Sequence, residues 1–232
     1  MGSFRISGTG LNGGIKMNVL GLDMSSQKSG YALYIDGELK DCDAWELSSD
    51  VEKDWRKRIA YMASRVHDCI VTNAVDMVYV EDVPPTIDNS QTVKVLSALQ
   101  GMIIAVCETV GAEVEFVPVK RWKSIIGINL ASSAENHACK DKIKKTCGKK
   151  AVKCLDKVKR WTKSWEKQLS VDYANHTFGL NLVYKSPTSK FNQDDIADAI
   201  NVAWSQIGEV QKYDLESFES IMDNFYELAT QE

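Results

Sequence analysis

Four carboxylates occupy positions at which proteins carry out metal-assisted chemistry. Two short apolar segments each end on an acid, Asp23 and Glu81, and a later segment with helical spacing carries Asp195 and Asp198. A carboxylate at the end of a buried strand is costly to desolvate, and several that converge repel one another unless a cation lies among them. Carboxylate oxygens are the ligands that hard divalent ions such as Mg²⁺ prefer. The set therefore predicts a divalent metal site, although any single one of these acids could merely end a strand or cap a helix.

The late acids belong to one predicted helix. Asp195 and Asp198 are three residues apart, so a helix places both on one face and directs them towards the same ion. Asp194 comes four residues before Asp198 and also lies near that face. An acid in the first turn of a helix interacts favourably with the positive end of the helix dipole, and we favour this structural role for Asp194.

The elements that must position these acids follow an α/β order. Strands expected over 17–23, 29–36 and 39–46 are joined by short turns, and one turn contains Asp36-Gly37, a hairpin signal. These strands would form an antiparallel meander. The apolar strand expected over 76–81 is typical of a central strand that is covered on both faces. The other expected elements are helices over 52–73, 90–109 and 193–206, and a strand over 113–117.

This order of acids and elements resembles the RuvC-type Holliday-junction resolvases, within the ribonuclease H-like nuclease superfamily. The likeness covers roughly residues 17–128 and 173–207, and a long insertion separates the two parts, as is typical of a phage or other mobile-element version. The resemblance rests on the four acids, on Ser25, Ser26 and Gly30 after the first of them, and on a helix, a strand and Pro118 in that order between residues 91 and 127.

The resemblance implies a fold and an activity. The fold would be ribonuclease H-like, a mixed five-stranded sheet with an antiparallel three-strand meander and helices on both faces, plus a basic helical insertion. The activity would be that of a Mg²⁺-dependent crossover junction endodeoxyribonuclease, which resolves four-way DNA junctions by paired nicks that leave a 5′ phosphate and a 3′ hydroxyl. Two Mg²⁺ ions per active site, or Mn²⁺ in their place, would be bound by the catalytic residues Asp23, Glu81, Asp195 and Asp198, with Asp23 between the ions, and the protein would act as a homodimer.

Charge is distributed unevenly along the chain. The formal net charge is −4, but residues 120–167 contain 15 lysines and arginines against four acids. Such segregation favours an anionic partner, and phosphate contacts by lysine and arginine supply most of the sequence-independent affinity for nucleic acid. A solvated, charge-rich helical insertion is the alternative. The candidate DNA-binding residues are Lys94, Lys120, Arg121, Lys123, Lys142, Lys144, Lys145, Lys149 and Lys150.

Two further questions concern which lysine assists the chemistry and what the tryptophans of the basic segment do. A lysine near the site would offset the charge that develops on the non-bridging phosphate oxygens, and Lys94, Lys120 and Lys142 are candidates. Three tryptophans among the basic residues could stack on the bases of a distorted junction, but we favour packing inside the protein. They are Trp122, Trp161 and Trp165.

Composition and length are those of one intracellular domain with extensions. Six cysteines form no CxxC pair and are expected to stay reduced, and no apolar run is expected to approach the roughly 18 residues of a membrane helix. We expect a cytoplasmic or nucleoid-associated protein, in the host cell cytoplasm if phage-encoded. The expected organisation is a flexible leader or cloning remnant over 1–16, a RuvC-like nuclease domain over 17–208 with the basic insertion at about 129–168, and an acidic amphipathic helix over 209–232.

One departure from the family pattern leaves the substrate open. Resolvases of this type often have an aromatic residue just after the strand-terminal glutamate, whereas Glu81 is followed by Asp82-Val83-Pro84-Pro85. The alternatives are a ribonuclease H-like nuclease acting on forks, flaps or RNA–DNA hybrids, and a non-catalytic nucleic-acid-binding relative. The non-catalytic alternative is disfavoured because all four acid positions are filled.

Overall fold

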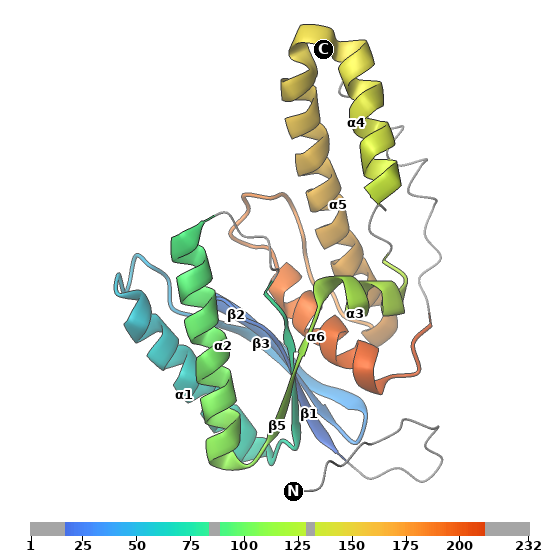
Figure 1. Ribbon diagram of the computed structural model, residues 1–232. Coiled ribbons are helices and arrows are strands. Elements are labelled where there is room, and N and C mark those ends of the chain that lie inside the picture. The colour runs from blue at the N-terminus through green and yellow to red at the C-terminus, as the bar shows by residue number, and fades with distance from the viewer. Residues whose placement is uncertain (1–16, 84–88, 129–132, 212–232) are drawn as a thin grey trace, which may run out of the picture.

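Five strands form one mixed sheet in the computed structural model, which describes residues 17–83, 89–128 and 133–211. The strand order is β3-β2-β1-β4-β5 (Figure 1). The first three strands form an antiparallel meander, and β4 runs parallel to both β1 and β5, which confirms the fold expected from the sequence. The strands are β1 (Asn18–Asp23), β2 (Lys28–Ile35), β3 (Glu38–Glu46), β4 (Met77–Glu81) and β5 (Glu113–Val117).

The turn between β2 and β3 is the predicted Asp-Gly hairpin. Asp36 has φ 54° and Gly37 has φ 82°. Two successive positive φ angles define a type I′ turn, whose twist matches that of the strands on either side. The register that follows pairs Asp23 of β1 with Gly30 of β2 at the opposite end of the meander.

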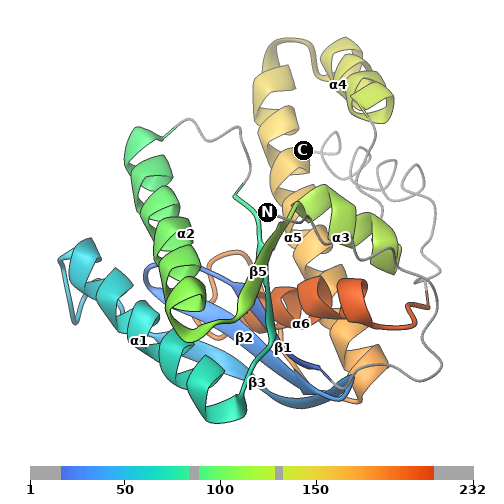
Figure 2. The ribbon, with the colours of Figure 1, turned by 60° about the horizontal axis from the view of Figure 1, so that its bottom comes forward.

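Helices cover both faces of the sheet. On one face lie α1 (Trp55–Asn73) and α2 (Ser90–Val110), and on the other lie α3 (Val119–Ile126), α6 (Asp194–Ile207) and part of α5 (Ala151–Phe178) (Figures 1 and 2). Side chains alternate along β1, so Leu20 and Leu22 pack towards α1 and α2 while Val19 packs towards α5 and α6. The same alternation turns residue 23 towards α6.

Side-chain caps and a buried stripe define the two helices of the first face. Asp54 accepts a hydrogen bond from the backbone N–H of Arg56 at the start of α1, and Asn89 accepts from two backbone N–H groups at the start of α2. By length and composition α2 could cross a membrane, a test that core helices also pass. In this fold α2 instead buries Leu99, Ile103 and Cys107 in the core beneath it.

Two glycines let α6 approach the sheet closely. A Cβ atom at Gly30 would lie 2.0 Å from the carbonyl oxygen of Asp195, and one at Gly21 would lie 2.2 Å from that of Ala199. Separations this short do not occur, so a larger residue at either position would push the helix away. The missing side chains therefore set the height of α6 above β1 and β2, and with it the position of the late acids.

The basic insertion is a helical hairpin that projects from the core (Figures 1 and 2). Its first arm is α4 (Ser133–Cys147), a 3₁₀ turn at Gly148–Lys150 follows, and its second arm is the outer part of α5. The break near Gly148 was expected, whereas α5 runs without interruption for 28 residues. The expected end of the insertion, residue 168, therefore falls inside a helix whose last turns, including Val171 and Tyr173, are buried in the core.

Several expectations fall outside the described residues. These are the leader over 1–16, the proline pair after Val83 and most of the acidic C-terminal segment, which is described only as far as Gln211. The cysteines whose side chains are described form no disulfide with one another: Cys42, Cys69, Cys107, Cys147 and Cys154.

Candidate metal centre

Three carboxylates meet where the fold brings two strand ends under one helix. Asp23 ends β1, Glu81 ends the neighbouring parallel strand β4, and Asp198 lies on α6. One oxygen from each lies within 4.8 Å of the others, and this is the metal-ligand group found among the described residues. Parallel neighbours end at the same edge of a sheet, so the sequence pattern of two strand-terminal acids is converted directly into proximity.

The environment disfavours three negative charges. Burial and the charges of Glu81 and Asp198 raise the pKa of Asp23 well above its ordinary value. Burial and the charge of Asp198 raise the pKa of Glu81 to about 8. Burial also raises the pKa of Asp198, although Lys123 opposes that shift. Burial and mutual repulsion therefore disfavour the ionised forms of these acids, and a bound divalent ion would offset that cost.

Two of the acids are oriented by groups behind them. The indole Nε1–H of the fully buried Trp122 donates to Oε2 of Glu81 at 3.1 Å. The hydroxyl of Ser170 on α5 hydrogen-bonds to Oδ1 of Asp198. Trp122 thus packs inside the protein, as we favoured over base stacking, and its polar edge also holds a site residue.

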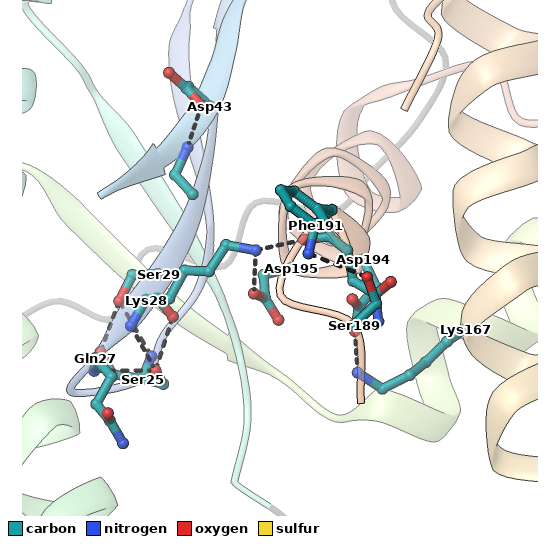
Figure 3. Close-up of polar contacts among 12 residues, drawn as sticks. Ser25, Gln27, Lys28, Ser29, Asp43, Lys167, Ser189, Phe191, Asp194 and Asp195 are labelled. Atoms are coloured by element: carbon teal, nitrogen blue, oxygen red, sulfur yellow. Dashed lines mark hydrogen bonds and ion pairs between the residues drawn. The ribbon is translucent and has the colours of Figure 1, made fainter. Parts of the chain in front are cut away.

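Asp195 is placed differently from Asp198. Its Oδ2 lies 3.1 Å from Nζ of Lys28, and that amine also donates to the carbonyl oxygen of Asn192 at 2.6 Å. Lys28 lies in a tight turn in which Oγ of Ser29 accepts from the backbone N–H of Ser25 and donates to its carbonyl oxygen, while Oγ of Ser25 donates to the carbonyl oxygen of Lys28 (Figure 3). In this arrangement Asp195 lies close enough for its charge to raise the pKa of Asp23, but it is not among the three converging acids.

Asp194 has a partner that the sequence did not indicate. It is buried, and its carboxylate forms an ion pair with Nζ of Lys167 on α5 (Figure 3). Burial disfavours the charged amine, but the hydrogen bond and the charge of Asp194 outweigh burial and raise the pKa of Lys167. Asp194 therefore fastens the first turn of α6 to α5, in addition to its place at the helix dipole.

The lysines whose charges act on the acids are Lys28, Lys123 and Lys167. Lys123 is buried on α3, and its charge lowers the pKa of both Glu81 and Asp198. The charge of Lys167 lowers the pKa of all three converging acids. The lysines suggested by sequence proximity lie elsewhere. Lys94 is exposed with its amine 5.8 Å from the ring centroid of Trp55, Lys120 is exposed on α3, and Lys142 is exposed on α4.

The candidate DNA-binding residues are distributed over three helices. Those of the hairpin are exposed on α4 and the 3₁₀ turn that follows it. Of the three on α3, Lys123 faces the acids, and Arg121 pairs with Glu115 at 2.9 Å. The exposed hairpin residues in the set are Lys142, Lys144, Lys145, Lys149 and Lys150.

Comparison with known proteins agrees on the fold. No family model matches the chain, and no curated protein matches it. Among solved structures, Thermus thermophilus RuvC in complex with a Holliday junction substrate shares 13% identity and a TM-score of 0.51 over 82% of this chain and 91% of that one. A further Thermus thermophilus RuvC structure gives 15% identity and a TM-score of 0.51 over 82% and 92%. The yeast mitochondrial resolvase Ydc2 shares 12% identity and a TM-score of 0.45 over 93% and 84%. The RuvC matches establish that the chain has a RuvC-like fold.

Proposed function

We propose that this protein is a metal-dependent endodeoxyribonuclease that resolves four-way DNA junctions. The observation that carries the proposal is the convergence of Asp23, Glu81 and Asp198 within 4.8 Å on a RuvC-like fold. Half-buried acids that raise the pKa of Asp23 and Glu81 are poorly suited to a purely structural role, because poorly compensated charge away from water destabilises a protein. They fit a hard divalent ion, which takes oxygen ligands and supplies the opposite charge.

The donor set of Asp23, Glu81 and Asp198 fits Mg²⁺ or Mn²⁺, and these acids would hold two ions per site. When bound, such ions would supply activation of the attacking water and stabilisation of the leaving 3′ oxygen in an in-line displacement at phosphorus. Trp122 and Ser170 keep Glu81 and Asp198 aimed at the site. The expected products are a 5′ phosphate and a 3′ hydroxyl.

Asp195 would be the fourth ligand. Its pairing with Lys28 at 3.1 Å holds it beside the three converging acids. Asp195 would help to hold a second ion, and its partner Lys28 would be available to a DNA phosphate. Lys123 and Lys167, whose charges already act on the acids, are positioned to offset negative charge at the scissile phosphate.

The neighbouring structures support junction DNA as the substrate, because a Thermus thermophilus RuvC with the same fold was solved with a Holliday junction. A two-fold symmetric junction needs two nicks, which a C2 dimer would supply. The outer face of α2 supports dimerisation, since its apolar residues Val93 and Ile104 are 40% and 44% exposed. Light scattering at micromolar concentration should detect a dimer.

The test is a panel of synthetic substrates. A mobile four-way junction, a fork, a flap, a linear duplex and an RNA–DNA hybrid of matched sequence would each be incubated with protein and Mg²⁺, and then with EDTA. We expect paired nicks in the junction, little cleavage of the duplex and none with EDTA. Preferential cutting of the fork, flap or hybrid would favour the alternative nuclease, and binding without any cleavage would favour the non-catalytic one.

A further inference from the structure

Helix α5 contributes a buried hydroxyl to the candidate metal centre. Ser170 has no exposed surface, lies in the inner part of α5, and hydrogen-bonds through Oγ to Oδ1 of Asp198. Asn201, one turn further along α6 than Asp198, is also fully buried. Its Nδ2 donates to Oγ of Ser170 at 2.8 Å and to the backbone oxygen of Ser170 at 2.9 Å.

The direction of these hydrogen bonds follows from their chemistry. An amide nitrogen only donates, so Oγ of Ser170 acts as the acceptor towards Asn201. The hydroxyl hydrogen of Ser170 is then left for the carboxylate of Asp198, which accepts it when ionised. The hydrogen bond from Asn201 thus makes the Ser170 hydroxyl a donor to Asp198. That hydroxyl holds Oδ1 of Asp198 in place, and Oδ2 stays available to a ligand.

Stability alone does not account for the amide at position 201. Among the described residues, Oδ1 of Asn201 is one of three buried side-chain atoms that have no hydrogen-bond partner. Leaving a buried polar oxygen unpaired costs stability, whereas an apolar side chain of similar size would avoid that cost. The amide offsets this cost by donating two hydrogen bonds to Ser170.

We propose that Ser170 is a positioning residue for Asp198 and that Asn201 sets its donor direction. The inference rests on the proposed function, which it deepens by making α5 part of the metal centre. Groups that hydrogen-bond to metal ligands fix the orientation of those ligands, and their loss weakens metal binding. The same continuous helix carries the basic hairpin at its other end, so DNA binding and the metal centre share one rigid element.

Metal binding without DNA tests the inference directly. Mn²⁺ would be titrated calorimetrically into wild-type protein, Ser170→Ala, Ser170→Thr and Asn201→Leu. We expect affinity to fall about 10–100-fold in Ser170→Ala and less in Asn201→Leu, and to be largely retained in Ser170→Thr, which keeps the hydroxyl. Ser205→Ala is the matched control, because Ser205 is a buried serine on α6 that donates to the carbonyl oxygen of Val202 instead of an acid.

The outcomes separate this inference from the proposed function. If wild type binds Mn²⁺ and Ser170→Ala binds it equally well, Ser170 is structural only and the inference is wrong, while the proposed function stands. If wild type binds no Mn²⁺, both are wrong. Thermal melting of each variant without metal shows whether it is folded, and Asn201→Leu carries the test if Ser170→Ala does not fold, since equal Mn²⁺ affinity there would also overturn the inference.

Discussion

Two regions of this molecule concentrate like charges, and they do so in opposite ways. At the metal centre three acids from β1, β4 and α6 converge within 4.8 Å, and burial raises the pKa of each. Residues 133–167, which form the hairpin and the next part of α5, contain 12 lysines and arginines against four acids. Most of these basic side chains are exposed, and their charge is accommodated by water and salt.

The difference shows what each region can bind. Half-buried acids gathered at one place suit a compact cation at a fixed position, so small changes there should have large effects. Exposed lysines on a helical hairpin suit any polyanion, and each contributes a modest, salt-dependent share. The two regions should therefore respond very differently to single substitutions, to added salt and to pH.

The largest expected effect is loss of catalysis at the acids. Asp23→Asn, Glu81→Gln and Asp198→Asn should each lower the rate of junction cleavage by about 10³-fold or more, equivalent to about 4 kcal/mol. Asp195→Asn should also nearly abolish cleavage if Asp195 is the fourth ligand. Junction binding should remain, because the basic surface is unchanged. Single-turnover assays measure the cleavage rate, and gel-shift assays measure junction binding. Asp172→Asn is the control, since Asp172 accepts a hydrogen bond from Gln168 on α5. Wild-type rates in Asp198→Asn would remove the site assignment.

The next effect is on stability and concerns how closely α6 lies on the sheet. In Gly30→Ala the new Cβ would meet the carbonyl oxygen of Asp195 at 2.0 Å, so α6 must move and the free energy of unfolding should fall by about 3 kcal/mol or more. Gly101→Ala is the matched control, because a Cβ there meets nothing within 4 Å. That substitution in mid-helix should be neutral or stabilising by up to about 1 kcal/mol. Urea denaturation compares the two, and equal stability of both variants would contradict the close approach.

A smaller effect per residue is expected in the hairpin. Replacing Lys142, Lys144, Lys145, Lys149 and Lys150 together by glutamine should weaken binding to every DNA shape. Every lysine that binds a phosphate in the wild type should, once replaced, reduce the slope of log affinity against log salt by about 0.9. Salt titrations of binding measure the slope, with Lys40→Gln and Lys57→Gln as control, since these lysines pair with Glu38 and Glu52. An unchanged slope would make the hairpin a solvated elaboration.

The smallest effect expected is a pH-dependent change in stability that metal reverses. The pKa of Glu81 is raised to about 8 by burial and by Asp198, so the folded protein holds a proton that the unfolded chain releases near its ordinary value. Stability without metal is then fully present at low pH and is lost as pH rises towards about 8. Mn²⁺ should raise the melting temperature more at pH 8 than at pH 6, since binding displaces protons. A Glu81→Gln protein should show less of this dependence, because of the three converging acids only Asp23 and Asp198 still have raised pKa values. A metal effect independent of pH would contradict the prediction.

The order of elements and the strand-end acids were predictable because each depends on local pattern. Short apolar strands and the Asp36-Gly37 turn fix the meander, and parallel strands bring their terminal acids together. The partners of those acids were not predictable. Ser170 and Asp198 are 28 residues apart, and Trp122 and Glu81 are 41 apart, so their contacts depend on how the helices cross the sheet.

The different partners of the three acids on α6 also could not be predicted from the sequence. Helical spacing places Asp194, Asp195 and Asp198 on nearby faces, and it does not distinguish them. The structure distinguishes them by their partners. Asp194 forms an ion pair with Lys167, and Asp195 forms one with Lys28. Asp198 instead lies beside Asp23 and Glu81. Lysine is common enough that no sequence signal marks Lys28 and Lys167 as partners. The uninterrupted course of α5 was missed for a related reason, since its composition changes from basic to apolar while its helix continues.

Diffraction from crystals of the protein soaked in Mn²⁺ would show whether the three converging acids bind a metal ion. Anomalous scattering locates manganese without reference to any assumed mechanism. We expect an anomalous peak bound by oxygens of Asp23, Glu81 and Asp198, with Asp195 turned away from Lys28 if a second ion is present, and no such peak in Asp23→Asn crystals. Manganese found only elsewhere, with the three acids still in contact and unliganded, would contradict this expectation.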